Sequence, residues 1–439
     1  FHRRAEFGQA LDCPAACSDR SRMIAKVLRV TYSILLILLT GCASLAPLLS
    51  PPTPAPVSQA TSTPRPLPSA TPTAQPVNTA RILRIWLPPR FDPNADTESA
   101  KLLKQRLAAF EASHRGLKIE VRIKAEVGET GLLNSLSVTS NAAPSALPDL
   151  IVLSRPDLET AALKGLLHPV DGLSTILNDP NWYEYARELG RVQNIGYGLP
   201  FAGNALVFIH RPAVEVNSWD GILASKENLL FPVSDPQAMV PLSIYISAGG
   251  KLINEQGLPT LEDAPLTQTL TLIQKGFEAK TFPLFMIDFK ADEEAFQAYH
   301  DGHANMVIGW AVHELRTAED IIEPIPGLGT PPLSLANGWA WALAGSAPEN
   351  QQVATELAEY LIADEFVSAW LPGTGYLPAR LSLTKNERAG LKSALEAAQA
   401  IPSNDVLAAL SPILNQALSR VLNGEQVSVV VGSVMEEFR

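Results

Sequence analysis

The chain has 439 residues, and its 34 Lys and Arg against 45 Asp and Glu give a formal net charge of −11 at neutral pH. Residues 1–80 hold seven of the basic and three of the acidic residues, so residues 81–439 carry 27 against 42, a net charge of −15. This balance argues against a nucleic acid or an anionic membrane surface as the partner. The three cysteines lie at positions 13, 17 and 42, so a domain of residues 81–439 depends on its core and not on disulfides.

Residues 1–22 precede the first methionine, Met23, and show no clear periodicity. They place four arginines ahead of a complete export signal, so we expect them to be translated upstream sequence that is not part of the mature protein. Cys13 and Cys17 fall within this segment and are therefore not evidence for a disulfide or a metal site.

Residues 23–41 have the organisation of an export signal: a lightly basic start, an apolar run over residues 32–39 and small residues at the end. The run is far shorter than the ~20 apolar residues that a membrane-spanning helix needs. The sequence Leu39-Thr40-Gly41-Cys42 resembles a bacterial lipobox, in which a peptidase cuts before a cysteine that then carries lipid. The resemblance implies a lipoprotein anchored through Cys42 at the outer face of the cytoplasmic membrane, extracellular or periplasmic. The alternative is a buried cysteine after a signal-like core.

Residues 42–80 form a tether between that cysteine and the globular part. Ten of the 38 residues after Cys42 are Pro, most others are Ser, Thr or Ala, and Arg65 is the single charge. Such a segment buries too little apolar surface to offset its chain entropy, and its prolines favour extended conformations. We expect a semi-stiff spacer that lifts the globular part away from the lipid.

The globular part begins with the pattern β-α-β-α-β. Residues 82–86 form a β-rich run, residues 117–123 alternate as a strand, and residues 148–153 form a buried-looking strand after a poorly defined helix. The apolar stripe of the first helix consists of Leu103, Leu107 and Phe110. Strands that alternate with helices indicate a parallel sheet with right-handed crossovers.

Eight short motifs follow one another in residues 82–86, 107–119, 148–152, 165–169, 197–201, 296–310, 338–343 and 375–380. In this order they resemble family 1 extracellular solute-binding proteins, the lipid-anchored receptors of ABC importers, of which the maltose-binding proteins are examples. No single motif is specific, but their order across the whole domain is. Phe201 stands where Tyr is common and Ala304-Asn305 where two Ala are common, which bears on the ligand and not on the family.

The resemblance implies an α/β fold of two lobes, the periplasmic-binding-protein fold, in which each lobe is a mostly parallel sheet flanked by helices. Hinge strands that cross between the lobes would join them. Lobe one would comprise residues 81–207 and 335–371, and lobe two residues 208–334 and 372–439. Turn signals at residues 211–212, 324–327 and 372–373 support these breaks independently. The ligand is expected in the cleft, beyond the carboxyl ends of the strands.

Tryptophans are the most informative residues for the ligand, because indole faces suit the apolar faces of sugar rings and the ring N–H can bind a hydroxyl. Trp86 ends the first strand, Trp310 follows the strand at residues 305–308, and Trp339 lies near the return to lobe one. Core packing is the alternative for each of them. Trp339 and Trp341 share one face of a strand, so both could belong to the core.

Six further residues complete the predicted ligand site through the resemblance and its topology. Four lie in loops expected to face the cleft, where they could bind hydroxyls or a carboxylate or could simply be solvated: Arg90, Arg155, Asn204 and Asn337. Phe201 and Tyr376 lie within two of the family motifs.

Neither a metal site nor a catalytic motif is predicted. His300 and His303 have i, i+3 spacing on a predicted helix without a supported third ligand, and His313 lies beyond a strand. The acidic residues 292–294 are interpreted as a solvated charge run. The sequence also holds no Gly-x-Ser-x-Gly elbow and no phosphate-binding Gly-Lys-Ser/Thr.

We therefore expect a non-enzymatic receptor that captures a small molecule, most simply a sugar or oligosaccharide, and delivers it to an ABC permease. By the same resemblance we expect a monomer without a cofactor. An organic acid or a polyamine is the alternative ligand, and a sensor read by a signalling partner is the alternative role. A surface lipoprotein enzyme such as a glycosidase is the reading from a different class, and it would need paired carboxylates at the cleft.

Overall fold

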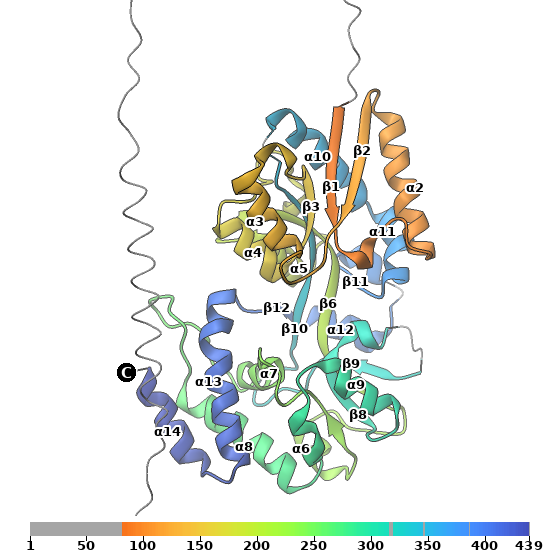
Figure 1. Ribbon diagram of the computed structural model, residues 1–439. Helices are drawn as coiled ribbons and strands as arrows, with labels where there is room; N and C mark the ends of the chain where they lie inside the picture. Colours follow the sequence, from red (N-terminus) through yellow and green to blue (C-terminus); the bar gives the residue numbers. More distant parts are fainter. Residues whose placement is uncertain (1–80, 316–318, 346, 386, 439) are drawn as a thin grey trace, which may run out of the picture. The chain divides into compact units, whose positions relative to one another are not determined.

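The computed structural model describes residues 81–315, 319–345, 347–385 and 387–438 (Figure 1). The expected upstream segment, export signal, Cys42 and tether all fall in residues 1–80, outside the described residues. Among the helices of the described ranges, none is long and apolar enough to cross a membrane.

The strands form one mixed sheet and one small hairpin. In chain order the strands are β1 (Arg81–Leu87), β2 (Leu117–Ile123), β3 (Leu150–Ser154), β4 (Arg191–Val192), β5 (Ile195–Gly196), β6 (Gly198–His210), β7 (Leu229–Leu230), β8 (Met306–Trp310), β9 (Ile321–Glu323), β10 (Ser334–Leu343), β11 (Leu377–Pro378) and β12 (Ala398–Ala400). The order in the sheet is β2-β1-β3-β10-β6-β8-β7, with β9 and β11 paired to β6 and β12 paired to β10. Strands β4 and β5 form the hairpin.

Helices cover both ends of this sheet. They are α2 (Glu98–Ser113), α3 (Leu132–Ala142), α4 (Arg155–Leu163), α5 (Glu184–Leu189), α6 (Trp219–Ala224), α7 (Met239–Ser247), α8 (Asp263–Glu278), α9 (Asp292–His300), α10 (Pro348–Leu361), α11 (Asp364–Trp370), α12 (Ala389–Glu396), α13 (Asn404–Leu422) and α14 (Val427–Glu437). Short 3-10 turns that bear on the site are η1 (Pro89–Phe91), η5 (Ala311–His313), η6 (Leu371–Thr374) and η7 (Leu381–Thr384).

The opening β-α-β-α-β pattern is confirmed, with β1 parallel to both β2 and β3. Helix α2 begins where the Thr97 hydroxyl accepts a hydrogen bond from the Ala100 amide at 3.1 Å, a cap worth about 1 kcal/mol. The predicted stripe of Leu103, Leu107 and Phe110 is buried against the sheet. The apolar period of the sequence thus sets which face of α2 meets β1 and β2.

Strand β1 is buried on both faces. Leu83, Ile85 and Leu87 belong to the main core cluster, whereas Trp86 points to the other face and packs with residues of α3 and α4 such as Leu136. A strand covered by helices on both sides is expected to be apolar throughout, as this one is. Because helices cover both faces of β1, the Trp86 side chain is buried in the core.

Two long strands cross between the two ends of the sheet, as Figure 1 shows for β6 and β10. We call the elements β1–β3, α2–α5, α10 and α11 lobe one, and α6–α9, β7–β9 and α12–α14 lobe two. Strand β6 pairs with β10 along residues 198–205 and with β8 along residues 206–210, so a single strand belongs to both lobes. The crossing strands pair antiparallel with each other and with β3 and β8, whereas the pairs β1-β2, β1-β3, β7-β8 and β10-β12 are parallel.

The third connection between the lobes passes through residues 377–389. Strand β11 pairs with β6, the Ser382 amide donates to Asn181, and the Thr384 hydroxyl is hydrogen-bonded to Tyr183, all of which tie this stretch to lobe one. Helix α12 then packs against β9 of lobe two. The lobe bounds expected from the sequence stay a prediction. The contacts of residues 377–384 favour a final crossing of the chain from lobe one to lobe two after residue 384 instead of at residue 372.

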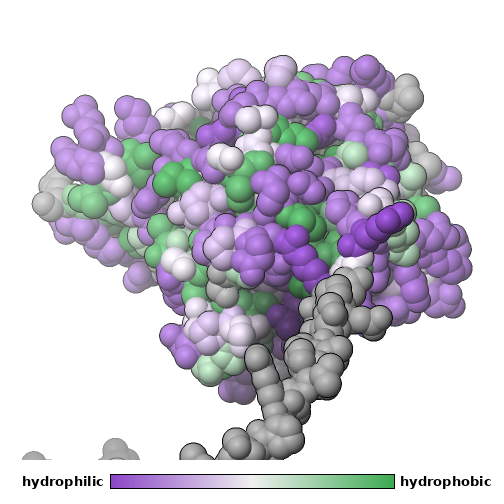
Figure 2. Space-filling model, turned by 90° about the horizontal axis from the view of Figure 1, so that it is seen from above, coloured by the Kyte–Doolittle hydropathy of each residue, from purple (hydrophilic) through white to green (hydrophobic). Residues whose placement is uncertain are grey.

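The face seen from above in Figure 2 is covered mainly by hydrophilic residues, with apolar residues in small separate groups. That distribution is ordinary for a water-facing surface. It agrees with the acidic charge balance of residues 81–439.

Candidate ligand-binding site

A cavity of about 170 Å³ lies where the crossing strands meet both lobes. Its lining residues are Arg90, Ser154, Asn204, Gln237, Trp310, Asn337, Gly338, Trp339 and Tyr376. These come from η1, β3, β6, the loop before α7, β8, β10 and the turn before β11. Segments that are far apart in sequence therefore converge on one hollow.

Six of the nine residues predicted for the ligand site lie together in this cavity. They are Arg90, Asn204, Trp310, Asn337, Trp339 and Tyr376. Trp86, Arg155 and Phe201 do not line it. The role of the six in ligand binding stays a prediction that their shared position makes testable.

The wall contributed by lobe one is an aromatic cluster capped by one cation. The guanidinium of Arg90 lies 5.3 Å from the centroid of Trp339 and 5.6 Å from that of Tyr376. Behind them, the ring of Phe91 packs edge-on to Trp339 at 5.8 Å and contacts Tyr376 at 5.9 Å. Trp339 and Tyr376 are each 8% exposed, so packing holds both rings in place.

Arg90 is itself held by a fork of hydrogen bonds. Its Nε and Nη2 atoms donate to the two carboxylate oxygens of Glu126 at 2.6 Å each, and Nη1 donates to the Tyr376 hydroxyl. Burial alone would lower the pKa of Arg90, but the bond to Glu126 and the neighbouring Tyr376 raise it. For the Tyr376 hydroxyl, burial instead raises the pKa, so the hydroxyl stays neutral. The wall thus presents fixed donors beside flat apolar surfaces, the combination that sugar rings suit.

The floor of the cavity is a pair of asparagines on the crossing strands. Asn204 on β6 lies opposite Asn337 on β10 in the strand register. The Asn204 side-chain oxygen accepts a bond from the Val312 amide at 3.1 Å, which joins the floor to lobe two. Gly338 follows, and a Cβ there would lie 2.4 Å from the Ala202 carbonyl oxygen. Only glycine permits this close strand approach.

The wall contributed by lobe two is sparser and more polar. It consists of Trp310, which is only partly buried at the end of β8, and the exposed Gln237. The Trp310 amide donates to the Asp292 carboxylate at 3.2 Å, so the first turn of α9 positions the indole. His313 forms an ion pair with the same carboxylate at 2.9 Å. Burial lowers the pKa of His313, but the bond to Asp292 and the negative charges of Asp292 and Glu293 together outweigh burial, so the net shift of the pKa is upward.

Trp86 lies in the core and not in the cleft, because it points to the face of β1 that α3 and α4 cover. It is 1% exposed and packs with Leu136 and Leu158, and the ammonium of Lys124 lies 4.9 Å from its ring. The prediction located the end of the strand correctly, but strand alternation sends this side chain away from the hinge.

Phe201 and Arg155 also point elsewhere. Phe201 packs among Phe91, Trp341 and Trp370 at ring distances of 5.2–5.4 Å, so it supports the lobe-one wall from behind. Arg155 opens α4 and pairs with Glu159 one turn on, at 3.2 Å. Burial lowers the pKa of Arg155, against the opposing charge of Glu159.

Sequence reasoning missed three lining residues. Ser154 directly precedes the predicted Arg155 and caps α4, so the strand end was found but the wrong one of two neighbouring side chains was chosen. Gly338 lies between the predicted Asn337 and Trp339. Gln237 lies in the loop before α7, which carries no motif, and it reaches the cavity only through the packing of the folded lobes.

A larger hollow of about 220 Å³ lies between η6, η7 and α12 and shares one lining residue, Tyr376, with the first cavity. Its lining is largely aliphatic, with Leu371, Leu377, Leu383 and Leu391 among its residues. It holds no indole and no pair of amides, so we place the ligand site in the cavity at the hinge.

The family follows from a match of residues 105–398 to the sequence profile described as bacterial extracellular solute-binding protein. The chain belongs to the bacterial extracellular solute-binding proteins. The family predicted from the sequence motifs is thereby confirmed, and binding of a solute is the function that this family shares. Among curated protein sequences, none matches the chain.

Solved solute-binding proteins share the fold. The GacH receptor of Streptomyces glaucescens is 17% identical with a TM-score of 0.62, and the match covers 82% of this chain and 98% of that one. The cyclic alpha-maltosyl-1,6-maltose binding protein of Arthrobacter globiformis is 14% identical with a TM-score of 0.66, and the match covers 80% of this chain and 96% of that one. A solute-binding protein of Thermotoga lettingae bound with tagatose is 19% identical with a TM-score of 0.60, and the match covers 81% of this chain and 98% of that one. These likenesses confirm the predicted α/β fold of a two-lobed periplasmic-binding protein.

Proposed function

We propose that this solute-binding protein captures a sugar or oligosaccharide in the hinge cavity and delivers it to an ABC importer. The observation that carries the proposal is the opposition of Trp339 and Tyr376 on one wall to Trp310 on the other, over a floor of two asparagines. Flat rings on both sides with amides between them suit a pyranose, whose faces are apolar and whose edge carries hydroxyls. Neighbours of the same fold are described as bound to acarbose, maltose and tagatose, which supports the sugar class.

Calorimetric titration with a panel of mono- and oligosaccharides tests the ligand class. At least one sugar should bind saturably, and Trp310→Ala should weaken that binding while leaving the melting temperature nearly unchanged. Phe285→Ala is the matched control, because Phe285 is an exposed aromatic residue of lobe two that does not line the cavity. If no sugar binds but an organic acid or a polyamine does, the carbohydrate proposal is wrong and the family assignment stands.

Lobe closure is the mechanism that we propose for capture. A ligand that touches both walls binds the closed arrangement better and shifts the population towards it. Strand β6, which pairs with both lobes, and the connection at residues 377–389 would flex as hinges. Small-angle scattering should show a smaller radius of gyration with saturating sugar. An unchanged radius would mean a rigid cleft, and delivery by closure would then have to be abandoned.

We further propose that the receptor is a lipoprotein held at the outer face of the cytoplasmic membrane through Cys42, with residues 43–80 as its tether. The lipobox resemblance and the proline content of the tether support this. In a bacterial host fed labelled palmitate, the chain should take up label and Cys42→Ser should abolish uptake and release soluble protein. Equal labelling of both forms would contradict lipid attachment at this residue.

A further inference from the structure

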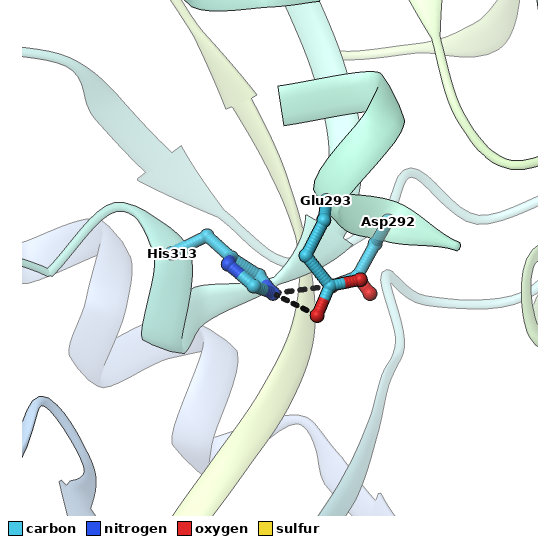
Figure 3. Close-up of side chains that lie close together, drawn as sticks. All are labelled: Asp292, Glu293 and His313. Atoms are coloured by element: carbon cyan, nitrogen blue, oxygen red, sulfur yellow. Dashed lines mark ion pairs between the residues drawn. The ribbon is translucent and has the colours of Figure 1, made fainter. Parts of the chain in front are cut away.

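Three side chains of metal-binding types lie close together in lobe two, as Figure 3 shows. Asp292 and Glu293 come from the first turn of α9, and His313 comes from η5 after β8. One ligand atom from each lies within 4.8 Å of the others. The His313 Nε2 atom is 2.9 Å from Asp292 Oδ2 and 3.9 Å from Glu293 Oε1. We call this group the 292–293–313 cluster.

The surrounding backbone fixes both halves of the cluster. The Glu294 carboxylate accepts the Lys290 and Ala291 amides at 2.6 and 3.1 Å, which sets where α9 begins. Gly309 lets α9 lie against β8, since a Cβ there would be 2.5 Å from the Phe296 ring and 3.3 Å from the Asp292 Cβ. The Phe296 ring contacts the imidazole of His313 at 5.0 Å. Asp292 and His313 are therefore held by packing that does not involve the solute, whereas the Glu293 side chain is exposed.

We propose that the 292–293–313 cluster binds Zn²⁺. Zinc takes both imidazole nitrogen and carboxylate oxygen as ligands, and three protein ligands leave its fourth position open. Ca²⁺ and Mg²⁺ prefer oxygen ligands alone and in larger number, so the histidine argues against them. The Trp310 amide bonded to Asp292 supplies the second-shell hydrogen bond that orients such a ligand.

The spacing of the donors fits the ion. Zinc–nitrogen and zinc–oxygen bonds of about 2.0–2.2 Å at tetrahedral angles place donor atoms about 3.3–3.5 Å apart. The two separations from His313 Nε2, 2.9 and 3.9 Å, bracket that range. The separation between the Asp292 and Glu293 donor atoms is within 4.8 Å, so the exposed Glu293 side chain has to rotate to bring its oxygen into place.

The local charge also favours a cation. Two carboxylates, those of Asp292 and Glu293, face one imidazole, and Asp235 lies close enough to Asp292 for their charges to interact. Arg90 is the cation of lobe one whose charge reaches His313, but its guanidinium is committed to Glu126. A bound Zn²⁺ would balance this excess and would leave its open position beside Trp310, for water or for an oxygen of the solute.

Zinc titration of the full chain without added sugar tests the proposal independently of the ligand class. All proteins carry Ser at positions 13, 17 and 42, so that thiolates do not compete for the ion. The parent should bind one Zn²⁺ saturably, and His313→Ala should weaken the binding at least tenfold. His300→Ala is the control, because His300 lies on the same helix and pairs with Glu314 outside the cluster.

A second variant and a spectroscopic measurement test the same cluster. Glu293→Gln removes an exposed carboxylate, so it should weaken zinc binding while the zinc-free melting temperature stays unchanged. Co²⁺ substituted for Zn²⁺ should give the intense visible absorption of four-coordinate cobalt in the parent and lose it in His313→Ala. Absence of saturable binding, or equal affinities of His313→Ala and His300→Ala, would overturn the proposal.

Discussion

The two walls of the cavity are built in opposite ways. The lobe-one wall of Arg90, Trp339 and Tyr376 is packed from behind by Phe91 and locked by the Arg90–Glu126 fork. The lobe-two wall has one partly buried ring, Trp310, set among charged side chains and fixed through its backbone instead of its indole. One wall is therefore organised before a ligand arrives, and the other gains its packing from the ligand.

This difference suggests an order of events. A rigid wall pays little ordering entropy when a sugar ring lands on it, so first contact should be with lobe one. Closure then brings Trp310 onto the opposite face of the ring and adds binding free energy that exists only in the closed state. The comparison predicts that truncation of a ring packed into the lobe-one wall lowers stability and binding together, whereas truncation of Trp310 in the lobe-two wall lowers binding alone.

The largest effect is expected for Phe91→Ala. Phe91 is 3% exposed and contacts the rings of four residues, so its truncation should cost about 3–5 kcal/mol of unfolding free energy and also weaken sugar binding. Trp86→Ala, in the core on the other face of β1, should cost a similar amount of stability without reducing the affinity of the folded protein. Denaturant unfolding and calorimetry measure both. Unchanged affinity in Phe91→Ala would remove the idea of a preorganised wall.

The next effect is expected for Trp310→Ala, which should weaken binding by about 1–3 kcal/mol, by analogy with stacking of bases on aromatic side chains. The melting temperature should stay close to that of the parent, because the indole is only partly buried. Titration calorimetry and differential scanning calorimetry on the same preparation give both numbers. A variant that loses several kcal/mol of stability instead would show Trp310 to be core, and the contrast between the walls would disappear.

A smaller effect is expected for Glu126→Gln, which frees Arg90 without changing the aromatic rings. The pair is partly exposed, so stability should change by less than about 1 kcal/mol. Affinity should fall severalfold, since Arg90 then has to be ordered by the ligand. Glu98→Gln, which breaks the exposed pair with Lys101 on α2, is the control and should leave affinity unchanged. Equal affinities of the two variants would show that the fork does not organise the wall.

The smallest effect is expected for Asp292→Asn in zinc-free buffer. The Asp292 bond raises the pKa of His313 against the effect of burial, so removal of the carboxylate charge should lower that pKa. A raised folded pKa stabilises below the unfolded value of about 6.5 and loses this contribution as the pH rises through the folded value. The stability lost in the variant should thus be larger at low than at high pH. Titration of the imidazole by NMR, with unfolding at two pH values, measures both; a pKa that rises would contradict the ion pair.

Local patterns in the sequence were enough for the opening strands and for α2, because the period of Leu103, Leu107 and Phe110 dictates the buried face. They also located most of the cavity, since strand ends in this fold meet at the hinge and the family motifs mark those ends. They could not decide side-chain direction there. Trp86 and Arg155 stand at correct strand ends but point into the core and along α4.

The 292–293–313 cluster could not be found from spacing. His313 lies twenty positions after Glu293, and β8 and the close approach at Gly309 bring the two residues together. The expected histidine pair on one helix is also not formed, because α9 ends at His300 and His303 lies beyond it. A sequence signal did exist in hindsight: a helix start and the end of the following strand meet at one edge of an α/β sheet. The interpretation of residues 292–294 as a solvated charge run overlooked that edge.

The most direct test of the central claim needs no assumption about which sugar binds. Purified protein is denatured, and the released small molecules are identified by mass spectrometry for the parent and for the double variant Trp310→Ala with Trp339→Ala. The account predicts a neutral carbohydrate released in stoichiometric amount by the parent and lost in the double variant. The same solute released in equal amount by both proteins, or an acid or amine in place of a carbohydrate, would contradict it.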